Sequence, residues 1–272
     1  MAFKDILLLL DLHSNQAGEY AAALASSCAA HITAATLVVG PEASIGFLDD
    51  SATFLASAIE DARDAAHRML EEFASRARRS GIMLETEVLN ALAGRSDRAL
   101  GPLARHFDLV VVEQPDVDFP RPRASTIEAV LFGSGRPVLV VPSGTAAPFR
   151  LEYVLVAWDG SATAARALGD AMPFLAQAKR VELVTVADAG DGLDASGHRI
   201  ARHLARHGLE TEFHRLPSVG SVGSTLLAHA SDCGTDLMVM GGYGHSRFRE
   251  LILGGATRDI LATMTLPVLM SH

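Results

Sequence analysis

Residues 237–261 read LMVMGGYGHSRFRELILGGATRDIL, and the interpretation of the whole chain starts from this stretch. The apolar run at 237–240 predicts a buried strand, and three glycines follow it within residues 241–244. A second glycine pair at 254–255 precedes an apolar helical pattern over 260–264. Two glycine turns therefore flank one short segment with helical spacing, an arrangement typical of a strand–loop–helix connection in an α/β fold.

These glycines also have a chemical use. Without a Cβ, a glycine adopts positive φ easily and lets amide N–H groups approach phosphate oxygens. The helix that begins after Gly255 would point its positive end at the same place. The stretch therefore predicts a phosphate cradle, although an ordinary strand-to-helix turn explains the same glycines.

Two common phosphate-binding motifs are excluded. No Gly-Lys-Ser/Thr sequence occurs, so a P-loop kinase or GTPase fits poorly. The glycine fingerprint of a Rossmann dinucleotide domain follows the first strand, whereas these glycines lie near the end of the chain.

The spacing Gly241-x2-Gly244-x9-Gly254 resembles the signature of the universal stress protein family, in the branch that binds ATP. That signature is Gly-x2-Gly-x9-Gly followed by Ser, Thr or Asn. This chain departs from it with Gly255 at the last position, which leaves the backbone N–H of Gly255 and the nearby hydroxyl of Thr257 to contact phosphate.

The chain contains one unit written twice. The strand 5–11, DILLLLD, matches 153–159, YVLVAWD, and an alanine-rich helix follows each. Further matches in the same order are strand 33–39 with 181–187, 108–112 with 236–240, and 136–140 with 266–270. Because five elements recur in order, the pattern indicates a duplication. The polar stretch 143–150 separates the halves, so we expect an N-terminal domain at 1–143 and a C-terminal domain at 151–272.

Strands that alternate with helices predict an α/β fold with parallel sheets. We expect two tandem flavodoxin-like domains, each a five-stranded parallel sheet with helices on both faces, and the family resemblance implies the same fold. In that strand order, strands one and four of a half are neighbours, and ligands bind beyond their carboxyl ends. Asp159 and Gly241 should therefore converge. The segments 137–141, PVLVV, and 267–270, PVLM, are candidate edge strands that would pair the two domains or join two chains in a homodimer. The resemblance implies that the two halves pair as a pseudo-dimer.

The resemblance implies the roles of individual residues. Asp159 would hydrogen-bond the ribose or adenine, Val186 would contact adenine through its backbone, and Met240 would line the base or sugar. The complete set of expected ligand contacts is Ala157, Trp158, Asp159, Val186, Met240, Gly241, Gly244, His245, Gly254, Gly255, Ala256 and Thr257. The residues from Gly241 onward would surround the phosphates. The expected ligand is ATP with Mg²⁺.

Plainer interpretations stay open for three of these residues. Asp159 begins an Asp-Gly-Ser triplet, which is common as a turn and helix N-cap. Trp158, the only tryptophan, suits packing at a strand end better than stacking on a base. His245 suits a solvated loop better than a direct phosphate contact.

The first half provides an internal comparison. Counting from Asp108 and Asp236, Glu113 and Asp116 stand where the second half has Gly241 and Gly244. Carboxylates repel phosphate, so we expect the first half to be a non-binding copy that shields the second.

Composition limits the partners and the compartment. A net charge of −9 and a pI of about 5.6 argue against nucleic acid and anionic membranes as partners. The longest apolar run near the N-terminus, 6–10, is too short for a signal peptide or a membrane span. Cys28 and Cys233 are too isolated for a disulfide framework and are expected to be buried thiols, so a cytoplasmic location is predicted. His203 and His207 have helical metal-ligand spacing, but no third ligand is evident, and no metal centre is predicted there.

The family resemblance implies a cytoplasmic stress-response protein that would bind ATP in its C-terminal domain and act by binding or slow hydrolysis. It is not expected to be a dedicated enzyme, because no strong catalytic base stands out. The alternatives are an interaction scaffold without nucleotide affinity, a nucleotide hydrolase, and a flavin or electron-transfer module on a similar sheet.

Overall fold

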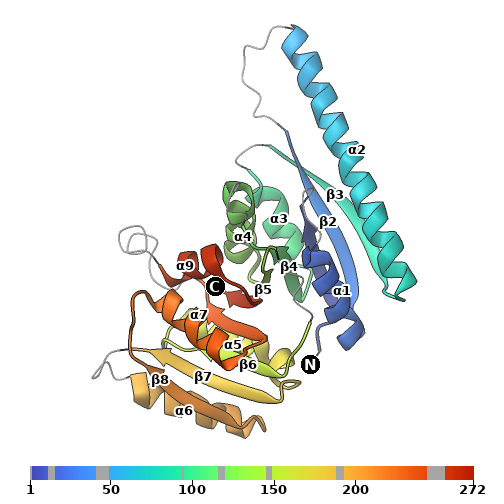
Figure 1. Cartoon of the computed structure of the whole chain (residues 1–272). Helices are drawn as coiled ribbons and strands as arrows, with labels where there is room; N and C mark the ends of the chain where they lie inside the picture. Colours follow the sequence, from blue (N-terminus) through green and yellow to red (C-terminus); the bar gives the residue numbers. More distant parts are fainter. Residues whose placement is uncertain are drawn as a thin grey trace.

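The computed structural model describes residues 2–11, 16–40, 49–92, 95–115, 120–144, 149–187, 193–243 and 255–272. In the first half, strands and helices alternate along the chain (Figure 1). The elements are β1 (Asp5–Leu10), α1 (Gln16–Cys28), β2 (His31–Gly40), α2 (Asp49–Arg79), β3 (Leu84–Leu92), α3 (Asp97–Ala104), β4 (Leu109–Glu113), α4 (Pro120–Ser134) and β5 (Val138–Val141).

The second half repeats this alternation. Its elements are β6 (Tyr153–Ala157), α5 (Ala162–Leu175), β7 (Arg180–Val186), α6 (Leu193–Arg206), β8 (Thr211–Leu216), α7 (Val222–Cys233), β9 (Leu237–Gly241), α9 (Ala256–Thr263) and β10 (Val268–Ser271). The expected helix after the second glycine turn is present as α9. Strand β8 was not identified from the sequence.

All ten strands form one sheet in the order β3-β2-β1-β4-β5-β10-β9-β6-β7-β8. Within each half, neighbouring strands are parallel, and β1–β4 and β6–β9 are paired as predicted for strands one and four. The halves join through β5 and β10, which pair antiparallel with Leu139 opposite Leu269. The α/β fold with parallel five-stranded halves is confirmed, and the antiparallel junction makes the complete sheet mixed.

Helices cover both faces of this sheet because side chains alternate along each strand. Leu8 belongs to the core cluster that contains residues of α1, α2, α5 and α6, and Leu7 to the cluster that contains residues of α3, α4, α7 and α9; both side chains are fully buried. Helix α2, with β2 and β3, extends past the rest of the first half (Figure 1).

Matching hydrogen bonds support the duplication at atomic detail. The Asp108 carboxylate accepts from the backbone N–H groups of Lys4 and Asp5, and the Asp236 carboxylate accepts from those of Glu152 and Tyr153. Each aspartate therefore ties the start of strand one to the start of strand four in its own half. The domain boundaries at 143 and 151 stay a prediction.

Candidate functional site

The carboxyl ends of β6 and β9 lie side by side in the second half (Figure 1). The register aligns Val156 with Val239, so the residues that follow β6 and those that end β9 emerge at the same edge of the sheet. This edge contains Asp159 and Gly241, which are 82 positions apart in the sequence by their numbers. The convergence expected from the strand order is present.

Asp159 is exposed and begins a tight turn at the start of α5. Its Oδ1 accepts a hydrogen bond from the Ser161 backbone N–H at 2.9 Å, and Gly160 between them has a φ of 76°. Ser161 then caps α5, because its Oγ accepts from the Ala164 backbone N–H at 3.1 Å. The turn-and-cap interpretation is therefore correct, and it leaves the carboxylate at the sheet edge in contact with solvent.

Trp158 is a packed residue. Its side chain is 8% exposed, its backbone N–H donates to the Val184 carbonyl at 2.8 Å, and its indole N–H donates to Ser196 Oγ at 3.0 Å. Because an apolar ring and a satisfied indole N–H both point inward, Trp158 fixes the end of β6 and does not offer a stacking surface.

The other residues predicted to contact the nucleoside lie at or near the carboxyl ends of their strands. Ala157 and Val186 are half-buried at the ends of β6 and β7, and Met240 is buried one residue before the end of β9. They surround a sheet edge where apolar side chains give way to loop backbone, which is a suitable environment for a planar base.

Gly241 has a packing role. A Cβ built on it would lie 2.6 Å from Thr163 Oγ1 and 2.7 Å from the Ala164 backbone nitrogen. Such distances are far inside van der Waals contact, so only glycine lets β9 approach the first turn of α5 this closely. This approach brings the turn that begins at Asp159 close to Gly241, the first residue of the predicted glycine loop at 241–255.

The glycine loop is anchored at both of its described ends. Tyr243 has a φ of 52°, in the left-handed region, and its backbone N–H donates to Thr257 Oγ1 at 3.1 Å. Thr257 is buried in the first turn of α9, and Gly255 begins that helix with no side-chain hydrogen bond at the cap. Of the predicted site residues, Gly244, His245 and Gly254 lie outside the described residues.

Tyr243 also reaches the first half of the chain. Its hydroxyl donates to Glu128 Oε1 of α4 at 3.2 Å, and its ring lies 5.2 Å from that of Phe132. Sequence reasoning did not identify this residue; its place between glycines was the available signal. The candidate site is therefore held against the other half.

The first half fills the equivalent position with side chains. By strand register, Glu113 and Gln114 correspond to Gly241 and Gly242, since Gln114 N–H donates to Val141 O and Gly242 N–H to Ser271 O, both at 2.8 Å. Both side chains are buried, and the Gln114 amide donates to the Leu261 carbonyl of α9 at 3.0 Å. The first half thus uses this edge for contact with the second.

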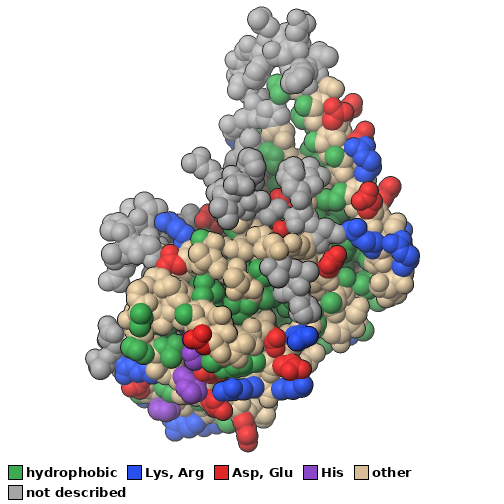
Figure 2. Space-filling view, in the orientation of Figure 1, with side chains coloured by type: hydrophobic (Ala, Val, Ile, Leu, Met, Phe, Trp, Pro, Cys, Tyr) green, Lys and Arg blue, Asp and Glu red, His purple; other side chains and the backbone are tan. Residues whose placement is uncertain are grey.

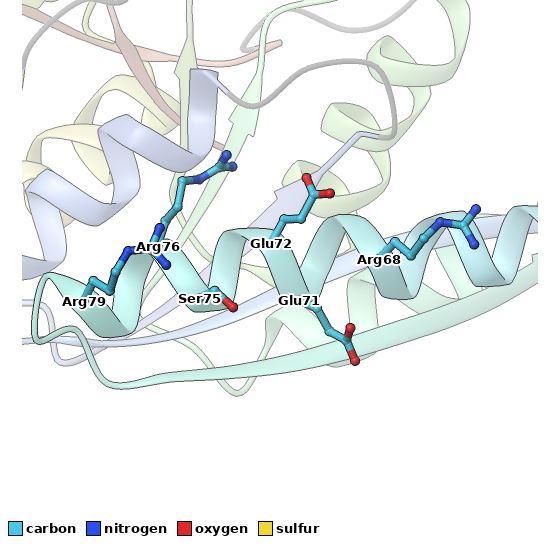
Figure 3. Close-up of a pocket in the computed structure, with 6 residues that line it drawn as sticks. All are labelled: Arg68, Glu71, Glu72, Ser75, Arg76 and Arg79. Carbon is cyan, nitrogen blue, oxygen red and sulfur yellow. The ribbon is translucent and has the colours of Figure 1, made fainter.

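A shallow hollow on the exposed face of α2 is a weaker candidate. Figure 3 shows that every residue lining it comes from this one helix and that the side chains spread away from the helix axis. A single helix face cannot enclose a ligand. The lining residues are Arg68, Glu71, Glu72, Ser75, Arg76 and Arg79.

Two histidines and both cysteines were singled out in the sequence. His203 and His207 stack edge to face at 4.8 Å between ring centroids on α6, and they belong to no group of three potential metal ligands within the described ranges. Cys28 and Cys233 are free thiols, as expected, but they are half-buried where buried thiols were predicted.

Comparison with known proteins shows what the C-terminal half resembles. Residues 151–272 match the model of the universal stress protein family. Universal stress protein Slr1230 from Synechocystis sp. (strain ATCC 27184 / PCC 6803 / Kazusa) is 28% identical over 152 residues, covering 53% of this chain and 50% of that protein. The alignment thus spans half the length of this curated relative.

Solved structures agree in fold over the whole chain. A universal stress protein from Archaeoglobus fulgidus DSM 4304 superposes with a TM-score of 0.75 at 20% identity, covering 98% of this chain and 95% of that one. A functionally unknown protein from Pseudomonas aeruginosa PAO1 gives 0.63 at 14% identity, covering 99% and 92%.

The C-terminal half of the chain, residues 151–272, therefore matches the universal stress protein family. The resemblance noted in the glycine spacing is confirmed at this level. In the part of the chain that the structure describes, no helix is long and apolar enough to cross a membrane.

Proposed function

We propose that the C-terminal half binds an adenine nucleotide, ATP with Mg²⁺, at the carboxyl ends of β6 and β9, and that the protein acts in a stress response through this binding or through slow hydrolysis. The observation that carries the proposal is the close approach of β9 to α5 at Gly241, which puts the Asp159 turn beside the glycine loop.

The groups at this edge suit the ribose, the base and the phosphates of a nucleotide. The exposed Asp159 carboxylate can accept hydrogen bonds from ribose hydroxyls, while Val186 and Met240 lie where a base would need apolar surroundings. At the opposite end of the ligand, the N-terminus of α9 offers backbone amides near Gly255, Ala256 and Thr257. Mg²⁺ would be bound mainly by phosphate oxygens and water.

The first half supports an assignment to one site per chain. Glu113 and Gln114 fill the position of the glycines there, and a carboxylate repels phosphate. The cytoplasm contains ATP and keeps thiols reduced, so a cytoplasmic location fits this function and stays a prediction.

The test is a calorimetric titration of Mg-ATP into chain freed of nucleotide, with Asp159→Asn and Asp11→Asn as a matched pair. Asparagine keeps the acceptor that the Ser161 N–H needs, so Asp159→Asn removes the charge without removing the turn. Asp11 follows strand one of the first half and serves as the control. We expect one site, about 10–100-fold weaker binding in Asp159→Asn, and unchanged binding in Asp11→Asn.

A third variant tests the phosphate end. Gly244→Asp reproduces the carboxylate of Asp116 and should abolish binding. If nucleotide-free wild-type chain takes up neither ATP nor ADP, the proposal fails, and the interaction scaffold becomes the better description. Phosphate release measured on the same samples separates binding from hydrolysis.

A further inference from the structure

A buried carboxylate lies at the other end of the second half. Glu182, near the start of β7, is 1% exposed, and α7 covers the sheet face to which it belongs. The Tyr153 hydroxyl donates to its Oε2, and His229 Nε2 lies 2.9 Å from its Oε1. Burying an ionised carboxylate is costly unless it is paired or bound to a metal, so this residue requires an explanation.

Two more potential ligands meet Glu182 from α7. His229 and Cys233 are four residues apart and therefore lie on the same side of the helix. Cys233 Sγ is 3.7 Å from His229 Nε2, and one atom from each of Glu182, His229 and Cys233 falls within 4.8 Å of the others. The three donor types converge on one small volume.

A second histidine stands at the rim of this cluster. His214 on β8 places Nε2 3.5 Å from Glu182 Oε1, and its side chain is 45% exposed. The same nitrogen is 3.4 Å from Glu212 Oε2. Arg180 is also near, but its guanidinium pairs with Glu212 at 2.7 Å and stacks on the Tyr153 ring at 4.6 Å. Its positive charge is thus directed to another carboxylate.

The geometry differs from that of a nucleophilic cysteine. In a catalytic triad, one ring nitrogen of histidine meets the nucleophile and the other meets the carboxylate. Here a single nitrogen, His229 Nε2, is nearest to both: 2.9 Å from Glu182 Oε1 and 3.7 Å from Cys233 Sγ, whose distance to Nδ1 is 4.0 Å. Convergence on a point suits a shared ion.

The distance between Cys233 and His229 also suits a tetrahedral metal, while the 2.9 Å between His229 Nε2 and Glu182 Oε1 would lengthen by about 0.4 Å around a shared zinc ion. Zinc–nitrogen and zinc–sulfur bonds of ordinary length place N and S about 3.5 Å apart around a tetrahedral centre. The 3.7 Å between Cys233 Sγ and His229 Nε2 is close to that value. Thiolate and imidazole ligands together favour zinc over magnesium or calcium.

We propose that Glu182 Oε1, His229 Nε2 and Cys233 Sγ bind a zinc ion, with His214 Nε2 or water in the fourth position. The Tyr153 hydroxyl holds the other carboxylate oxygen and so orients Glu182 for one-oxygen binding.

This site is separate from the candidate nucleotide site. Tyr153 and Glu182 lie in the amino-terminal parts of β6 and β7. In contrast, Asp159 lies beyond the carboxyl end of β6, and Gly241 is the last residue of β9. Figure 2 shows histidine side chains gathered among acidic and basic ones at the end of the molecule formed by β7, β8 and α6. A zinc ion there would join α7 to the outer strands of the sheet.

The ligand set is particular to the second half. By strand register, Thr33 on β2 corresponds to Glu182. Counting back equally from Asp108 and Asp236, Gly101 and Arg105 correspond to His229 and Cys233. The duplicated fold therefore does not require these side chains, and the first half provides a natural control.

The first experiment is a zinc titration of the full chain after chelator treatment, monitored by competition with a chromophoric chelator. We expect one zinc per chain with a submicromolar Kd, weakened at least 10-fold in each of Glu182→Gln, His229→Gln and Cys233→Ser. Cys28→Ser and His207→Gln are matched controls that keep wild-type affinity. Zinc should also raise the Tm of wild-type chain by about 5 °C at saturation and leave that of Cys233→Ser unchanged.

Cobalt substitution identifies the sulfur ligand. Co²⁺ in the wild type and in Cys28→Ser should give a thiolate-to-metal charge-transfer band that Cys233→Ser lacks. The proposal is overturned if wild-type chain binds no zinc stoichiometrically, or if Cys233→Ser, shown to be folded by circular dichroism, binds zinc and cobalt as the wild type does. The conservative substitutions keep this test valid, because Gln at 182 preserves the acceptor for Tyr153.

Discussion

Gly241→Ala tests whether close packing of β9 on α5 holds the candidate nucleotide site together. The added Cβ would lie 2.6 Å from Thr163 Oγ1, 2.7 Å from the Ala164 nitrogen and 2.8 Å from the Thr163 carbonyl carbon. Two of these three atoms are backbone, so rotating the Thr163 side chain cannot relieve the overlap. The first turn of α5 has to move away from β9 by about 0.7 Å to reach ordinary contact distance.

Overpacking of this kind costs about 1–3 kcal/mol. For a chain of this size we expect the Tm to fall by about 3–10 °C. Because the Asp159 turn begins the same helix, Mg-ATP affinity should fall as well. Thermal unfolding followed by circular dichroism gives the first quantity, and calorimetry gives the second.

Gly169→Ala is the matched control within α5. A Cβ at Gly169 has nothing within 4 Å, so alanine there gains helix propensity without strain. We expect it to stabilise the chain by about 0.5–1 kcal/mol. Adding Thr163→Ala to Gly241→Ala should restore only part of the loss, since the backbone contacts remain. A Gly241→Ala chain that melts with the wild type would refute the packing argument.

Three further predictions concern the junction and the thiols. Gln114→Ala removes the side chain that donates to the Leu261 carbonyl and accepts from the Ser143 N–H. It should lower the free energy of unfolding, measured in urea titrations, by about 1–3 kcal/mol. Gln114→Glu should not restore stability, because a carboxylate cannot donate a hydrogen bond to Leu261. Leu139→Ala and Leu269→Ala, at fully buried and mutually opposite positions, should each cost about 2–5 kcal/mol by the same assay, and nearly equal costs are expected from their related surroundings. Burial raises the pKa of the Cys28 thiol, so iodoacetamide should modify this thiol slowly at pH 8. The thiol's contribution to stability is present below its unfolded-state pKa and should be lost as pH rises through its folded-state pKa. A Cys28→Ser chain whose alkaline melting curve matches that of the wild type would contradict this.

The central strands were predictable because parallel strands buried on both faces produce continuous apolar runs such as residues 6–10 and 109–112. Strand β8 was not, since TEFHRL lies at the edge of the sheet and is only partly buried. Its polar sequence lacks the apolar periodicity from which a strand is predicted, and His214 was missed for the same reason.

The site was predictable where its signal is local. The Asp-Gly-Ser triplet indicated the turn that the structure shows at Asp159. The glycine loop stays a prediction, because residues 244–254 lie outside the described ranges. Contacts between the halves were not predictable: Gln114 reaches Leu261 across 147 positions and Tyr243 reaches Glu128 across 115. Such pairs depend on how β5 meets β10, which a single sequence does not specify.

The junction of β5 with β10 has a consequence for how this protein can evolve. In a homodimer, one gene encodes both chains, so a substitution that damages one subunit also damages the other. Here the two copies are encoded separately within one polypeptide, so they cannot dissociate when the protein is diluted. Selection can therefore reshape one copy into a scaffold while the other keeps or acquires chemistry, and each molecule retains a fixed ratio of the two.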